Sequence, residues 1–328
     1  MIGVRPGVRP RFRRGLTPRI WGLTPYPGLT PNSTRRRLLG ALCLAPFAAH
    51  AQERFSLFVA SDPNNVSRMV RIAALRDNDV VIDLGSGDGR GVIAAAQTNP
   101  TVRGFGVDID AKLVQQASAN AQAAGVGDRV EFQHRNAFDA DLSQVDVIFM
   151  WFFPELMRLL RSKILREARP GTRVVAALWD MGTWRADAVD KDPSDVNLWI
   201  VPAPVAGFWD WELTIEGTRQ RYSALFEQHF QTLEAAVRAG NRHGIFNDLK
   251  LRGEEISFVL MMTLPGVGFT RHEFSGWVRG GRMEGSVRIT LPPKTNEEDE
   301  ELETLVLPWQ ATRVSGSGFF APVGVDLG

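Results

Sequence analysis

A chain of 328 residues, 44% of them hydrophobic and 23% charged, is long enough to form two domains and to bury a sizeable core. Its 38 basic and 37 acidic residues are unevenly placed, because residues 1–51 hold nine arginines and no acid. The remainder carries 29 basic and 37 acidic residues, so we expect no general attraction to nucleic-acid phosphates and no nucleic-acid partner. Cys43 is the single cysteine, which excludes disulfides within the chain and cysteine-based metal sites.

The first 51 residues are typical of a disordered leader followed by a signal peptide. Gly-Leu-Thr-Pro recurs three times before residue 32, and this Pro- and Gly-rich composition predicts disorder. A basic run at 33–37, an apolar run at 38–49 and an A-x-A site at 49–51 predict cleavage before Gln52 and a periplasmic protein. The arginines also resemble a twin-arginine signal, which exports folded proteins. The apolar run is too short for a stable membrane anchor, and if it is an ordinary helix the protein is cytoplasmic.

The most informative motif runs from Asp83 to Gly89 with the sequence Asp-Leu-Gly-Ser-Gly-Asp-Gly. It follows an apolar strand at 80–84 and precedes a helix predicted at 91–96. A Walker loop requires a lysine after the glycines and a dinucleotide loop requires G-x-G-x-x-G, and neither pattern is present here. The carboxylate of Asp83 would repel phosphates, whereas it would attract a cation. S-adenosylmethionine (SAM), with its ammonium and sulfonium groups, is such a ligand.

A second acid ends the next predicted strand. Asp108 follows the apolar residues 104–107 and lies 25 positions after Asp83. An acid at this point of a βαβ unit can accept hydrogen bonds from ribose hydroxyls. Asp110 is the competing candidate, and we expect it to cap the helix predicted at 111–124 instead.

The alternation of strands and helices continues along the chain. Residues 129–138 predict a third strand with its loop, residues 145–150 and 172–178 two more strands, and residues 155–168 a helix. This order predicts a doubly wound parallel α/β sheet whose ligand lies over the carboxyl ends of its strands. Trp151 directly follows the strand at 145–150, so we expect it at the same edge as the two acids.

These motifs resemble the class I SAM-dependent methyltransferases. Residues 58–213 look like a bacterial branch of that class, and the loop opens with D-L-G-S-G as in protein-lysine methyltransferases. The resemblance implies a Rossmann-like seven-strand methyltransferase sheet over residues 52–214 and SAM as cofactor. It also implies that Asp108 contacts the ribose and Asn136 the adenine amino group, through an amide oxygen that can accept the bond. The cofactor-binding residues it implies are Asp83, Gly85, Ser86, Gly87, Gly89, Asp108, Asn136, Ala137 and Trp151.

The acceptor side is less determined. Phe152, Phe153 and Glu155 are candidates for the substrate pocket, because aromatic faces stabilise a cationic amine and an acid can orient it. Core packing for the aromatic rings and a first-turn helix position for Glu155 are competing roles. The sequence Phe-Phe-Pro-Glu at 152–155 departs from the N-P-P-[YFW] step of nucleic-acid N-methyltransferases, which argues against that substrate class. The catalytic residues remain unassigned.

The last third of the chain changes its pattern. Strands predicted at 196–202 and 208–213 complete the seven-strand sheet, the last one antiparallel. Residues 215–328 then form a small C-terminal antiparallel β domain, with short strands between Gly-rich turns. Within it, residues 222–237 have apolar side chains at helical spacing, and we predict a helix there. The acidic segment 294–303 is predicted to be a solvated loop and not a metal site.

We therefore expect a SAM-dependent methyltransferase whose acceptor is a protein lysine or a small molecule. Methyl transfer is an in-line displacement, so positioning and desolvation can supply much of the catalysis and no base is obligatory. The alternative is an exported, non-catalytic SAM-binding protein that contacts an envelope partner. The predicted signal peptide favours that alternative, since SAM is made in the cytoplasm. The residues Asp83 and Arg90 disfavour NAD-dependent chemistry.

Overall fold

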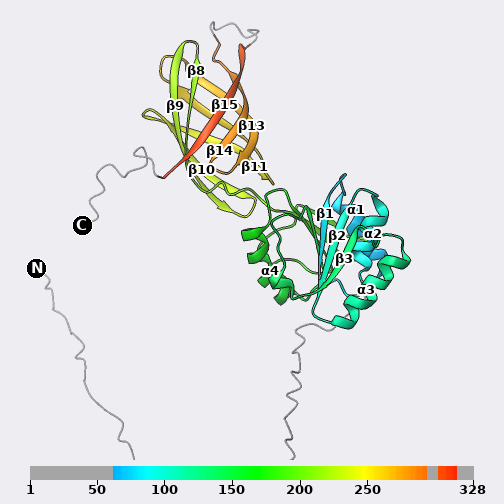
Figure 1. Ribbon diagram of the computed structural model, residues 1–328. Helices are drawn as coiled ribbons and strands as arrows, with labels where there is room; N and C mark the ends of the chain where they lie inside the picture. Colours follow the sequence, from blue (N-terminus) through cyan, green and yellow to red (C-terminus); the bar gives the residue numbers. More distant parts are fainter. Residues whose placement is uncertain (1–61, 294–301, 316–328) are drawn as a thin grey trace, which may run out of the picture. The chain divides into compact units, whose positions relative to one another are not determined.

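The computed structural model describes residues 62–293 and 302–315, which form a mixed β-sheet with flanking helices and a closed β-barrel (Figure 1). Within these residues, every helix is too short or too polar to cross a membrane. The predicted leader and signal peptide lie outside the described residues, as does most of the predicted acidic loop at 294–303. Their predictions therefore stay predictions.

The sheet has seven strands in the order β3-β2-β1-β4-β5-β7-β6. The first five run parallel, as predicted, whereas β7 is antiparallel to β5 and β6 is antiparallel to β7. The first strand, β1, lies inside the sheet, with β2 and β3 on one side of it and the later strands on the other. In folds of this kind, ligands bind over the carboxyl ends of the strands where the order reverses, which here are β1 and β4. The strands are β1 Val80–Leu84, β2 Arg103–Asp108, β3 Val130–His134, β4 Val147–Met150, β5 Arg173–Ala177, β6 Ala188–Asp190 and β7 Val196–Ile200.

Helices cover both faces of the sheet (Figure 1). Because side chains alternate along a strand, Val81 packs with the helices of one face and its neighbour Ile82 packs with α4 on the other. Asp110 caps α3 by accepting a hydrogen bond from the backbone N–H of Lys112, as predicted. The helices of the first face are α1 Pro63–Ala73, α2 Arg90–Thr98 and α3 Ala111–Ala123; α4 Pro154–Glu167 lies on the second, and a 3-10 turn, η1 Ala137–Asp139, follows β3.

A buried ion pair joins the first helix to the sheet. The guanidinium of Arg173, at the start of β5, lies 2.6 Å from the carboxylate of Asp79, and both side chains are less than a tenth exposed. The same guanidinium donates to the backbone carbonyls of Ala73 and Ala74, where α1 ends. Removing one partner of such a pair leaves a buried charge without compensation, so we expect this pair to fix α1 on the sheet.

The C-terminal antiparallel β unit is confirmed, and it closes into an eight-strand barrel through the pairing of β15 with β8. Large aromatic side chains such as Trp211 and Phe274 fill its interior, which an eight-strand barrel has just enough width to hold. Among them, the hydroxyl of Tyr222 lies 3.1 Å from Nε2 of His272. The strands are β8 Gly207–Ile215, β9 Thr218–His229, β10 Thr232–Ala239, β11 Arg242–Arg252, β12 Glu255–Leu264, β13 Gly268–Arg279, β14 Arg282–Thr290 and β15 Thr304–Val314.

Two predictions for this region were wrong. Residues 222–237 form β9 and β10 and not a helix. Tyr222 and Phe226 are four positions apart, so they share a face in a strand as they would in a helix, and the strand is selected by backbone pairing on both sides. Residues 208–213 belong to β8, which pairs with β9 and β15 instead of completing the sheet.

Candidate functional site

The glycine-rich loop joins β1 to α2 at the carboxyl edge of the sheet. Gly85 and Gly89 have φ angles of 76° and 84°, a region that other residues rarely adopt. Packing also requires glycine, since a Cβ on Gly85 would lie 2.5 Å from the ring of Phe152 and one on Gly89 would lie 2.5 Å from the ring of Phe132. The loop is therefore fixed both by its backbone conformation and by the aromatic rings around it.

Asp108 binds this loop from the end of β2. Its Oδ2 accepts a hydrogen bond from the N–H of Gly87 at 2.9 Å, and its Oδ1 accepts one from the N–H of Asp110 at 2.9 Å. The N–H groups of Gly85 and Ser86 donate to the carbonyl of Val107 at 2.8 and 3.0 Å. The structure thus brings Asp108 and the loop together, as the sequence predicted, while the contact with a ribose stays a prediction.

Asp83 is the acid in front of the loop, and its carboxylate is packed against the start of α2, where a Cβ on Gly91 would lie 2.5 Å from Oδ2. Burial raises the pKa of Asp83 to about 8, and the carboxylates of Asp108 and Asp88 add to the rise. The pKa of Asp88 shifts in the opposite direction, because the hydrogen bonds of its carboxylate with Arg90 lower it. A partly buried acid with a raised pKa favours a positively charged ligand, which stabilises its ionised form.

Ser86 supplies a hydroxyl at the same place. Its side chain is buried, and its Oγ has no hydrogen-bond partner within the described part of the chain. Because buried polar groups are normally paired, we expect a partner from outside the described residues. One hydroxyl and two carboxylates suit a ligand that carries cationic groups and ribose hydroxyls, and SAM has both. The residues present therefore fit this cofactor.

The remaining predicted cofactor residues lie at the same edge with local packing roles. Asn136, followed by Ala137, caps η1, because its Oδ1 accepts a hydrogen bond from the N–H of Phe138 at 3.0 Å. An amide oxygen has two lone pairs, so this cap leaves a second acceptor position. Trp151 is half-buried and packs with the hydrophobic cluster on the face of α1 and α2. Their contacts with the cofactor stay predictions.

The three predicted pocket residues, Phe152, Phe153 and Glu155, have different environments in the structure. Phe152 packs against Gly85 and the hydrophobic cluster on the α4 face, so it joins the glycine-rich loop to the core. Phe153 immediately precedes α4 and is 48% exposed. Glu155 is exposed in the first turn of α4, where a carboxylate favours the positive end of the helix dipole.

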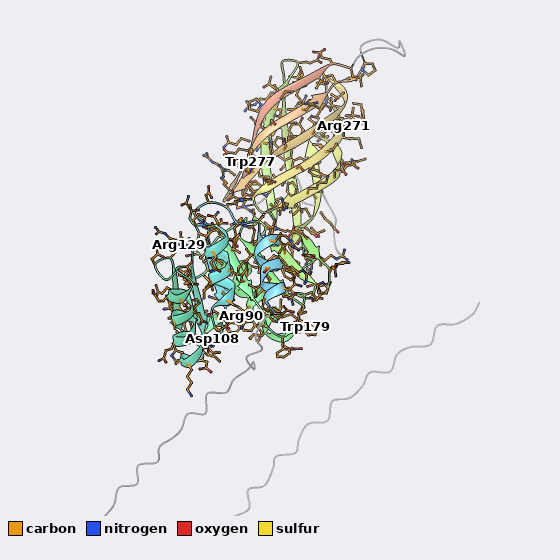
Figure 2. The ribbon with its side chains drawn as sticks, turned by 90° about the vertical axis from the view of Figure 1, so that its right-hand side faces the viewer. Arg90, Asp108, Arg129, Trp179, Arg271 and Trp277 are labelled. Carbon is orange, nitrogen blue, oxygen red and sulfur yellow. The ribbon has the colours of Figure 1, made fainter. Side chains whose placement is uncertain are left out.

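The reasoning from sequence did not identify two further residues at this edge, Leu178 and Trp179. They directly follow β5 and are 41% and 42% exposed. Figure 2 shows Trp179 at the same end of the sheet domain as Asp108 and Arg90, with Arg129 toward the opposite end. A signal was present in the sequence, because a tryptophan at the carboxyl end of a buried parallel strand lies where ligands bind. Trp179 is the second residue after β5, and Trp151 is the first residue after the neighbouring strand β4, so the same reasoning applies to both.

Comparisons with known proteins cover the sheet domain. A family model of the ANTKMT methyltransferase domain matches residues 83–188. A protein-lysine N-methyltransferase of Saccharolobus islandicus is 34% identical over 134 residues, which are 41% of this chain and 83% of that protein. The adenine nucleotide translocase lysine N-methyltransferase of Mus musculus is 28% identical over 160 residues, which are 48% of this chain and 69% of that protein. A solved RNA methyltransferase of Salinibacter ruber in complex with S-adenosyl-L-homocysteine is 40% identical with a TM-score of 0.43, over 45% of this chain and 96% of that one.

Proposed function

The chain belongs to the class I SAM-dependent methyltransferases, and we propose that its methyl acceptor is the side-chain amine of a lysine in a protein. The observation that carries the proposal is the 34% identity to a protein-lysine N-methyltransferase over 83% of the length of that protein. The mouse relative, named for a lysine of the adenine nucleotide translocase, supports the same acceptor class. Aromatic side chains beside the loop, which attract cationic amines, are consistent with it.

The residues that hold the cofactor follow from their chemistry. Asp108 would accept hydrogen bonds from hydroxyls of the ribose, and Asp83 would face the cationic part of the ligand. Ser86 contributes its buried hydroxyl. When bound, SAM supplies an electrophilic methyl group.

On the acceptor side, the chain acts by positioning. Phe152 closes one side of the loop with an aromatic ring and keeps water from it. A lysine attacks as the neutral amine, so its proton leaves to solvent or to a nearby carboxylate before transfer. Orientation of the amine and exclusion of water are then the contributions expected from the protein, in agreement with an in-line displacement that needs no dedicated base.

Labelling with tritiated SAM tests the acceptor class. The full chain is incubated with labelled SAM and a protein extract, the protein fraction is hydrolysed, and its amino acids are separated. We expect the label in methylated lysine, with loss of labelling in Asp108→Ala and normal labelling in Asp128→Ala, which removes an exposed acid before β3. Label recovered in RNA, in a small molecule or in another amino acid would refute a lysine acceptor.

We also propose that the chain is exported and that its mature form begins at Gln52. Support comes from the basic run, the apolar run and the A-x-A site within residues 33–51. N-terminal sequencing of the native protein from separated periplasmic and cytoplasmic fractions tests it. A cytoplasmic protein that retains the apolar run would refute export.

A further inference from the structure

We infer that Leu178 and Trp179 form a preformed docking element for the methyl acceptor, and that the segment they bind is a lysine flanked by apolar residues. The inference rests on the proposed lysine acceptor and assigns part of its recognition to a turn. The turn comprises residues 178–180, directly after β5. Its position, backbone conformation, exposure and chemistry each support this role.

The turn lies at the edge where the chemistry takes place. β5 is the neighbour of β4, which in turn neighbours β1 and its cofactor loop. Because β1, β4 and β5 are parallel, Trp179, after the end of β5, lies at the same edge of the sheet as Asp83 in β1. Phe153, after the end of β4, lies at this edge too. Figure 2 shows Trp179 and Asp108 at this end of the domain.

The backbone of the turn is strained and held in place. Leu178 has a φ of 71°, and the N–H of Trp179 donates to the carbonyl of Ala177 at 3.0 Å, which makes a γ-turn of the rarer, strained type. The N–H of Leu178 donates to the carbonyl of Asp195 at 2.7 Å. The buried side chain of Asn197, on β7, donates to the carbonyl of Trp179 at 3.3 Å. Strain of this kind persists where the surroundings impose it, and it is concentrated at functional sites.

The strained turn directs two large apolar side chains to the surface. All five residues of β5 are buried, and the next two side chains are 41% and 42% exposed. The other tryptophans of the β5–β7 region, Trp184 and Trp199, are fully buried in the core. The indole of Trp179 is therefore not used to fill the core, although the sheet would gain from burying it.

The chemistry of the turn matches a lysine with apolar neighbours. The face of an indole is the strongest aromatic site for a cation, and the exposed Asp180 adds negative charge one residue further on. Leu178 offers an aliphatic surface beside them, which suits a leucine, isoleucine or phenylalanine next to the lysine. A peptide whose lysine has only polar neighbours would leave that surface without a partner.

Kinetics with two peptide series test the inference in the full chain. Lysine-centred nonapeptides carry either leucine or serine at the positions beside the lysine, and tritiated SAM reports methylation. We expect Trp179→Ala to raise KM for the leucine series about tenfold with little change in kcat, the size of one lost cation–aromatic contact together with buried apolar area. Trp179→Phe should restore most of the affinity, and SAM affinity should be unchanged in both.

A second variant removes the side chain without disturbing the turn. Leu178→Gly suits the positive φ, so the variant should be at least as stable as the wild type, yet it should lose the preference for leucine over serine. The matched control is Trp277→Ala, which removes an indole of similar exposure, 48%, from barrel strand β13. We expect it to leave KM unchanged.

The outcomes separate this inference from the proposed function. Methylation of peptides by the wild type with equal KM values in Trp179→Ala would refute the docking element and leave the lysine acceptor standing. The same would hold if Trp277→Ala caused an equal loss, or if Leu178→Gly kept the leucine preference. A wild type that binds SAM but labels neither peptide series, while labelling a small amine, would refute the lysine acceptor and the docking element with it.

Discussion

Protonation of Asp83 should control the affinity for SAM. Burial, with the neighbouring acids Asp108 and Asp88, raises its pKa to about 8, so at pH 7 only about a tenth of the free protein carries the ionised acid. The ionised form is the one that attracts the ammonium and sulfonium groups. Affinity for SAM should therefore rise with pH, about ninefold from pH 6 to 7 and about fivefold from pH 7 to 8, with about 0.9 proton released per SAM at pH 7.

Calorimetric titration at these pH values, in buffers of different ionisation enthalpy, measures both quantities. The α-amino group of SAM also titrates, at about pH 8, so Asp83→Asn is the matched control that retains the titration of the ligand. Subtracting its pH dependence isolates the contribution of Asp83. An affinity that does not change between pH 6 and 8, or an identical pH dependence in Asp83→Asn, would refute the linkage.

Three further predictions concern stability and are measured by denaturant unfolding. Gly85→Ala combines a positive φ with a steric clash and should lower the free energy of unfolding by about 2–4 kcal/mol. Gly125→Ala, with a similar φ and open space around it, should lower it by only about 1 kcal/mol, and equal losses would refute the packing role of Gly85. Burial lowers the pKa of His272 to about 4, so this histidine binds its proton more tightly in the unfolded chain than in the folded barrel. The free energy of unfolding should therefore fall by on the order of 3 kcal/mol from pH 6.5 to 4, and the same fall in His272→Gln would contradict this. Arg173→Met should destabilise the sheet domain by about 3–5 kcal/mol, because it leaves the buried carboxylate of Asp79 without its counter-ion, and the additional change Asp79→Asn should recover part of that loss.

Local patterns made the arrangement of the glycine-rich loop and its acids predictable. An apolar strand that ends in an acid, with glycines at fixed spacing after it, specifies both the turn and the position of the Asp83 carboxyl group. The same reasoning located Asp108 and the cap at Asp110, and the structure brings all three to one edge of the sheet. Each of these features is determined by residues close together in the sequence, which is why the sequence is informative there.

Features that depend on distant pairing were not predictable. The exposure of Trp179 follows from a turn that is held by Asp195 and Asn197, which belong to a later part of the chain. The short β6 has only three residues and is defined by its pairing with β7. Residues 222–237 fit two periodicities, and only the neighbouring strands of the barrel select between them.

Co-crystallisation with S-adenosyl-L-homocysteine tests the central claim, that the loop from Asp83 to Gly89 and the end of β2 form the cofactor site. The expected result is one ligand over the carboxyl ends of β1 and its neighbours β2 and β4, with its ribose hydroxyls on Asp108 and a hydrogen bond to Oγ of Ser86. A ligand bound elsewhere on the chain, or crystals without ligand density at a saturating concentration, would contradict the assignment of this loop.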